Sequence, residues 1–252
     1  MNKARLKRAK PNLASPRILR EVLELPTAPY YEQRVRRHIR AFVASRRHLA
    51  YREDRWGNIL VSLKARKAGT PVVFTAHMDH PGFEIARAGF AAEARWLGNV
   101  PGPKPRGLPV TVVTPDDEEV GGKAVSNFTK RGKRQYFSLK MDAPVPPGSF
   151  GYWGFPGYEK KGHVVHTKGA DNLGSCAALL ALLDDLRPAK VRRPVACLFT
   201  RAEEEGFQGA QAAVMSGLLS RKSLVVVLET SKEFPGGKMG LGPVIRVADR
   251  AL

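Results

Sequence analysis

Acidic side chains, together with one histidine, follow three apolar runs of this 252-residue sequence at the point where each run ends. These residues are His77 and Asp79 after PVVFTA, Glu203, Glu204 and Glu205 after PVACLFT, and Glu229 directly after LVVVL. Ligands bind at the carboxyl ends of the strands in open parallel sheets, so strands made from these runs would bring the side chains to one edge. Asp171, just before a helical segment, is expected at the same edge.

Carboxylates gathered in this way repel one another unless cations neutralise them. Zinc accepts imidazole nitrogen and carboxylate oxygen, and a catalytic zinc site leaves one position for water. The neighbours Glu203 and Glu204 can then divide two tasks, one as a metal ligand and the other as a base. Taken singly, Asp171 would be an ordinary helix N-cap and the glutamates a solvated loop. Their coincidence at three strand ends favours a pair of metal ions.

Hydrophobic periodicity indicates the elements that must position these residues. Short, continuous apolar runs separated by helical segments are typical of the central strands of a parallel sheet. The predicted strands are 59–63, 71–76, 194–200 and 224–228. The predicted helices, which have periodic or Ala- and Leu-rich sequences, are 15–25, 30–47, 172–186 and 208–220. We therefore expect an α/β protein, a three-layer sandwich around a mostly parallel central sheet.

Residues 86–166 differ in composition, with Gly, Pro, aromatic residues and short alternating stretches. A segment of roughly 80 residues is too long for a plain loop inside a compact domain. We therefore predict three parts: a basic flexible leader at 1–14, a catalytic α/β domain made of 15–85 and 167–252, and an inserted, small all-β domain at 86–166. Cys176 and Cys197 stand among apolar residues and are expected to be buried thiols without a disulfide.

Four segments resemble, in order, the glutamyl and deblocking aminopeptidase family of co-catalytic zinc peptidases, which includes tetrahedral aminopeptidases. They are TAHMDHPGFEI, KGADNLGSCAALLALL, RAEEEGFQGA and VVVLETSKEFPGG. The resemblance implies a zinc-exopeptidase-like fold and a hydrolase that removes N-terminal residues from peptides through a metal-activated water. It also implies two divalent ions, with zinc expected and cobalt or manganese as alternatives. The inserted domain implies homo-oligomerisation.

The same resemblance assigns a role to six of the residues at the predicted edge. His77 would bind the first metal and Asp79 would orient that histidine. Asp171 would bridge the two metals, and Glu204 would bind the second. Glu203 would be the catalytic base and acid. Glu229 would bind the first metal, at a position where the family usually has Asp.

One histidine of the family has no counterpart here. It binds the second metal from a segment well downstream of the position of Glu229, and this sequence ends at Leu252. We therefore expect a chain that lacks the C-terminal part of the family. Its second site would keep only Asp171 and Glu204 and bind metal weakly, unless His80, His163 or His166 substitutes. Whether the chain hydrolyses peptides therefore depends on whether the second site still holds its ion.

The net charge of +19 suggests other functions. Residues 1–70 contain 18 Lys and Arg against 5 Asp and Glu, and such a cluster attracts polyanions. A catalytically impaired homologue that binds RNA or another polyanion is thus an alternative, although no nucleic-acid motif accompanies the charge. A related di-zinc deacylase or carboxypeptidase is another, because it shares the acidic motifs. No apolar run approaches the length of a membrane span, so a cytoplasmic protein is expected.

Overall fold

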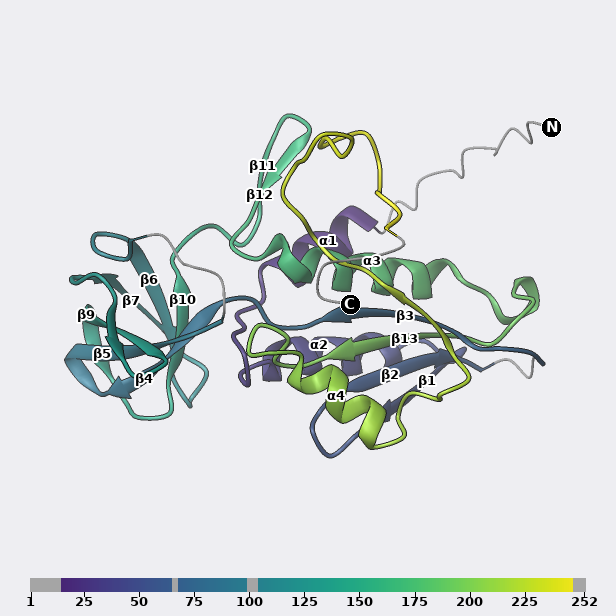
Figure 1. The fold of residues 1–252 in the computed structure, drawn as a ribbon, viewed down its shortest axis with the longest axis horizontal. Helices are drawn as coiled ribbons and strands as arrows, with labels where there is room; N and C mark the ends of the chain where they lie inside the picture. Colours follow the sequence, from purple (N-terminus) through teal and green to yellow (C-terminus); the bar gives the residue numbers. More distant parts are fainter. Residues whose placement is uncertain (1–14, 65–67, 99–103, 247–252) are drawn as a thin grey trace.

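The structure, a computed structural model, describes residues 15–64, 68–98 and 104–246. The predicted leader at 1–14 lies outside these residues. Figure 1 shows two bodies side by side, a sheet covered by helices and a smaller body made only of strands. In the described part of the chain, no helix is both long and apolar enough to span a bilayer.

The helix-covered sheet has five strands. In spatial order they are β1 (Leu49–Glu53), β2 (Ile59–Leu63), β13 (Val195–Thr200), β3 (Val72–His77) and β14 (Leu224–Val227). Strand β3 is parallel to both β13 and β14, whereas β2 is antiparallel to both β1 and β13. The sheet is therefore mixed: β1, β13, β3 and β14 run in one direction, in line with the predicted mostly parallel sheet, and β2 runs against them.

The reason lies in the short connection between β1 and β2. Oδ1 of Asp54 accepts hydrogen bonds from the backbone N–H groups of Trp56 and Asn58, which closes a tight turn. A connection this short joins strands only as an antiparallel hairpin, whereas parallel neighbours need a long crossover. Strand β1 itself was not predicted, because its sequence LAYRE carries only a weak apolar pattern.

Helices pack against both faces of this sheet. They are α1 (Ser15–Leu23), α2 (Gln33–Ala44), α3 (Ala170–Asp185) and α4 (Gln208–Met215), with a short 3-10 helix η1 (Pro188–Lys190). In β13, Cys197 and Phe199 join the core shared with α1, α2 and α3, while Ala196 and Leu198 join the core shared with α4. Because both faces of the strand are buried, its sequence is continuously apolar. Both cysteines are free and buried.

The all-strand body is a seven-stranded antiparallel sheet within residues 82–153. Its spatial order is β5 (Gly89–Leu97), β4 (Gly82–Arg87), β10 (Phe150–Trp153), β6 (Pro109–Val113), β7 (Glu119–Ala124), β9 (Arg134–Val145) and β8 (Thr129–Arg131). Strand β5 also pairs with β9, so six strands close into a barrel and the two edges that an open six-stranded sheet would have are paired with each other. An aromatic cluster that includes Phe83, Phe137 and Trp153 fills the interior. A hairpin follows, β11 (Glu159–Lys161) and β12 (Val164–His166).

Part of the basic charge near the N-terminus comes from arginines of α2 that form ion pairs with other residues of the chain. Arg34 pairs with Asp117 at 2.7 Å and with Glu119 at 2.6 Å, so α2 is fastened to the barrel. Arg36 and Arg40 both pair with Glu53 on β1. These arginines therefore balance carboxylates of the same chain.

Glu53 gives a prediction for stability against pH. Burial by itself raises its pKa, but hydrogen bonds from Tyr51, Arg36 and Arg40 outweigh burial and lower the pKa from 4.5 to about 2. Because the folded-state pKa is depressed, the stabilisation is complete above about pH 4.5 and is lost as the pH falls toward 2. Glu53→Gln should lower the free energy of unfolding by on the order of 2 kcal/mol at neutral pH, and by less than half of that near pH 3.

Urea unfolding of both proteins at the two pH values measures this difference. Glu21→Gln, which breaks the exposed pair Arg17–Glu21, is the control and should change stability by roughly 0–1 kcal/mol. An equal effect of Glu53→Gln at both pH values would contradict the ion-pair explanation.

Candidate metal centre

His77 is the last residue of β3 and its side chain is only 3% exposed. Its Nδ1 lies 3.0 Å from the main-chain oxygen of Asp79, a contact in which a protonated Nδ1 donates. That hydrogen bond leaves Nε2 as the nitrogen available to a ligand. The thiol of Cys176 on α3 donates to the main-chain oxygen of His77 at 3.1 Å, which anchors the strand end. The imidazole is thus held from two sides.

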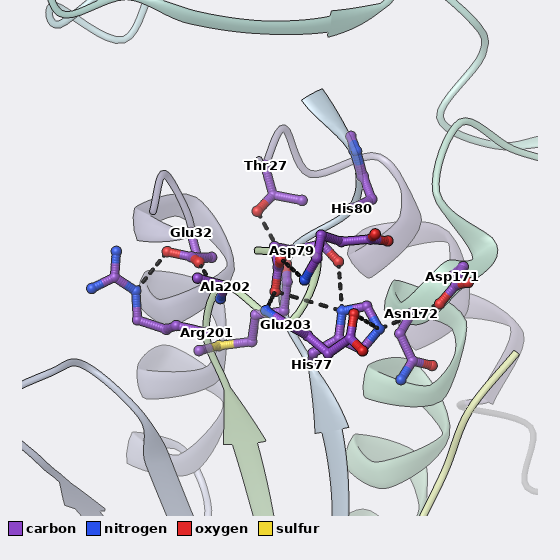
Figure 2. Close-up of polar contacts among 12 residues, drawn as sticks. Thr27, Glu32, His77, Asp79, His80, Asp171, Asn172, Arg201, Ala202 and Glu203 are labelled. Atoms are coloured by element: carbon purple, nitrogen blue, oxygen red, sulfur yellow. Dashed lines mark hydrogen bonds and ion pairs between the residues drawn. The ribbon is translucent and has the colours of Figure 1, made fainter. Parts of the chain in front are cut away.

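Three carboxylates surround the free Nε2 of His77, as Figure 2 shows for two of them. The distances from Nε2 are 3.3 Å to Asp171, 3.6 Å to Glu229 and 3.7 Å to Glu203. Zinc ligands stand about 2.0–2.2 Å from the ion, so neighbouring ligand atoms of a tetrahedral site are separated by roughly 3.4 Å. The observed separations match that spacing. His77, Glu203 and Glu229 together can hold a metal ion.

Electrostatics at this edge also fit a cation. Burial by itself lowers the pKa of His77, but Asp171, Asp79 and Glu229 outweigh it and raise the pKa far above its usual value. Burial raises the pKa of Glu203, and the nearby Glu229 raises it further, although His77 lowers it. The carboxylates therefore favour the positively charged form of the imidazole. A divalent ion would supply the same neutralisation.

Asp79 organises the loop that carries the glutamates. Its side chain is fully buried, and its two carboxylate oxygens accept the backbone N–H groups of Glu203 at 3.1 Å and Glu204 at 3.2 Å. The Oδ1 atom also lies 3.5 Å from Nδ1 of His77. One carboxylate therefore sets the position of both the histidine and the loop after β13.

Glu204 is buried next to this cluster but is not among the residues grouped around Nε2 of His77. The pKa of Glu204 is raised to about 8, mainly by burial. His77 lowers this pKa and Glu203 raises it. An ionised carboxylate in such a place is costly unless a cation lies beside it. Glu204 therefore has the chemistry of a ligand for a second ion.

Asp171 and Glu229 reach the edge from α3 and from the segment after β14. Asp171 and Asn172 have non-helical backbone angles, so the chain departs from the helix axis where the carboxylate must turn toward His77. The side chain of Asn172 donates to the main-chain oxygen of Leu228 at 2.8 Å. The hydroxyl of Thr230 donates to the main-chain oxygen of Ala170 at 3.2 Å. These bonds tie the two segments together on either side of Glu229.

The three substitute histidines do not join this cluster. His80 is buried, but its Nδ1 contacts the main-chain oxygen of Pro81 and its ring lies edge-on to Tyr152, pointing away from His77 in Figure 2. His163 and His166 lie on the exposed β11–β12 hairpin. Glu205, the third glutamate of the run, turns toward the barrel and accepts the N–H of Gly98 at 2.7 Å.

Sequence reasoning missed Glu32 and Arg201. Glu32 precedes α2, is 0% exposed, and binds Arg201 at 2.6 Å. Arg201 lies two positions before the run of glutamates, and this neighbourhood could have marked it as a residue of the site. Glu32 carried no comparable signal, because nothing in its local sequence distinguishes it from a solvated helix-start glutamate.

The family model of M42 glutamyl aminopeptidases matches residues 140–252, which confirms the predicted resemblance. An aminopeptidase from the archaeon Desulfurococcus kamchatkensis has a similar fold, with a TM-score of 0.72 and 18% identity over 89% of this chain and 66% of that one. The TET1 peptidase of Pyrococcus horikoshii gives a TM-score of 0.68 and 22% identity over 85% and 68%. The chain spans 63% of the length of another matching TET1 structure.

Proposed function

We propose that this chain, which is related to the M42 glutamyl aminopeptidases, is a metal-dependent aminopeptidase that removes residues from the N-termini of peptides. The observation that carries the proposal is the group of carboxylates around Nε2 of His77, at 3.3–3.7 Å, at the carboxyl end of a central strand. Their separations and their concentrated negative charge beside the buried imidazole suit a divalent cation. Zinc is the ion we propose, because it accepts this mixture of nitrogen and oxygen ligands.

We assign the ligands as follows. His77 and Glu229 would hold the first ion, Glu204 the second, and Asp171 would bridge the two. The contacts of Asp171 and Glu229 with the imidazole support the first site. The buried position of Glu204 supports the second. Asp79 would fix His77 through its main-chain oxygen, which leaves Nε2 free for the metal.

Glu203 is the proposed general base and acid. When bound, the ions would polarise the peptide carbonyl and activate a water molecule. The carboxylate of Glu203 would accept the proton of that water and later donate it to the leaving amine. Its pKa is raised by burial, which suits a group that must both take and return a proton near neutral pH. Its backbone N–H, bound by Asp79, holds it at the edge of the sheet.

The experiment is a metal titration coupled to a substrate panel. The chain is stripped with a chelator, reloaded with zinc, and its bound metal is counted by elemental analysis. One tightly bound ion and a second, weakly bound ion per chain are expected, because only Asp171 and Glu204 remain to hold the second. Hydrolysis of aminoacyl amides, but not of N-acyl amino acids, is expected once zinc is high enough to fill both sites. Hydrolysis of the acylated set alone would indicate a deacylase or carboxypeptidase. Failure to bind any ion would exclude the proposed metallopeptidase function.

We also propose that residues 86–166 form an inserted domain on a catalytic domain made of 15–85 and 167–252, and that copies assemble through the insertion. The closed barrel within residues 82–153 supports a separate folding unit. The Pyrococcus horikoshii TET1 peptidase assembles into a tetrahedron or an octahedral shell, which supports assembly of a relative with the same fold. Light scattering of the purified chain would test this, and a monomer would contradict it.

A further inference from the structure

The loop between β13 and α4 has a backbone conformation that its own sequence does not favour. Ala202 is 2% exposed and has a φ of +45°, in the left-handed region that residues with a β-carbon rarely adopt. Such a residue persists only where its surroundings hold it in place. The next two residues are Glu203 and Glu204, so whatever holds Ala202 also determines where these carboxylates point.

Glu32 holds this loop from the N-terminal side. One carboxylate oxygen accepts the backbone N–H of Ala202 at 3.0 Å, and the other accepts Nε of Arg201 at 2.6 Å. The guanidinium of Arg201 also donates to the main-chain oxygens of Trp56 at 2.7 Å and Tyr30 at 2.6 Å. Arg201 is therefore fastened on three sides, and Glu32 provides the only charged partner that the described residues give it.

Asp79 holds the same loop from the other side. Three successive backbone N–H groups, those of residues 202 to 204, are thus shared between two buried carboxylates, Glu32 and Asp79. Figure 2 shows Asp79 between the Glu32–Arg201 pair and the imidazole of His77. Since Asp79 also contacts His77, the loop and the histidine are fixed within one network. Release of Glu32 would leave Ala202 and Arg201 without their anionic partner.

We propose that Glu32 is a positioning residue of the metal centre, which sets Glu203 and Glu204 against His77 by binding Arg201 and Ala202. The inference rests on the proposed function, because it gives these two glutamates their roles in metal binding and proton transfer. Glu32 touches no reacting atom. Its effect passes through the backbone of the loop, so a change at Glu32 alters the geometry of the centre without removing any of its ligands.

The test compares Glu32→Gln with Glu53→Gln. Glutamine keeps the size of the side chain and removes the charge that Arg201 requires. Glu53 is the matched control, since it too is a mostly buried carboxylate bound by arginines, but it lies on β1 and does not contact the loop. Both variants are expected to unfold more easily than the wild-type protein. Only Glu32→Gln should affect the loop and the metal.

Three measurements separate positioning from plain stabilisation. In the chelator-stripped protein, hydrogen exchange of the peptide covering 201–207 should accelerate at least about tenfold in Glu32→Gln and stay unchanged in Glu53→Gln. Competition with a colorimetric chelator should show zinc affinity about 10–100-fold weaker for Glu32→Gln alone. With aminoacyl amides, kcat should fall about 100-fold while KM changes little.

A second pair of variants tests the same contact by rescue of zinc affinity. It remains informative if Glu32→Gln alone folds poorly. Arg201→Gln alone should reproduce the defect, whereas the double variant Glu32→Gln with Arg201→Gln should recover part of the zinc affinity, because two facing amides can hydrogen bond. Equal zinc affinity in Glu32→Gln and Glu53→Gln would overturn the proposal. A wild-type protein that neither binds zinc nor hydrolyses amides would refute the proposed function instead, and the exchange measurement would still decide whether Glu32 holds the loop.

Discussion

Glu203→Gln should lower kcat for aminoacyl amides by about 10²–10⁴-fold while the protein keeps its metal. The amide of glutamine has nearly the size of the carboxylate but cannot accept a proton from water or return it to the leaving amine. The backbone N–H of residue 203 still binds Asp79, so the loop keeps its position. Single-turnover kinetics and metal analysis of the same preparation measure both quantities.

The matched control is Glu205→Gln, two positions further along the same acidic run. Its carboxylate accepts the N–H of Gly98, and a glutamine oxygen can make the same bond, so kcat should stay within about threefold of the wild-type value. Because Glu203 lies 3.7 Å from Nε2 of His77, a role as ligand is the competing explanation. Loss of bound zinc in Glu203→Gln would support that role and contradict the assignment as base.

His77→Ala should abolish binding at the first metal site. Ligands that bind only the folded state stabilise it, by about 2.7 kcal/mol at a free concentration one hundred times the dissociation constant. For a chain of this size that corresponds to a rise of about 5–10 °C in Tm. The rise produced by zinc in the wild-type protein should be largely lost in His77→Ala, because Asp171, Glu203 and Glu229 then have no imidazole between them. Differential scanning calorimetry with and without zinc measures it.

His166→Ala is the control for this variant. His166 lies exposed on β12, so its removal should leave the zinc-dependent rise in Tm unchanged. An equal loss in both variants would mean that the hairpin contributes a ligand, and the placement of the centre at His77 alone would be wrong. A full rise in His77→Ala would show that zinc stabilises the chain through another site.

The sequence predicted the main helices and strands well where apolar residues form continuous runs or recur at helical spacing. The strand at 59–63 was predicted with the bounds that β2 has, and the other three predicted strands each correspond to an observed one. The predicted helices 30–47 and 208–220 are shorter in the structure, ending at Ala44 and Met215. The first is followed by the charged residues Arg46 and Arg47, and the second by Gly217, whose φ of +70° is the left-handed conformation in which helices commonly end. Helix ends are the least certain part of such predictions.

The sequence by itself also determined which side chains meet at one edge of the sheet. A carboxylate or histidine directly after an apolar strand must lie near the strand's carboxyl end, so His77, Glu203 and Glu229 were placed at one edge without knowledge of the contacts. Only the tertiary structure decided the strand directions, the failure of His80 to reach the cluster, and the link from Glu32 to Arg201. Periodicity reflects neighbours along the chain, whereas these three features depend on segments that meet only after folding. The contact between Glu32 and Arg201 joins residues 169 positions apart, and nothing local to either one encodes it.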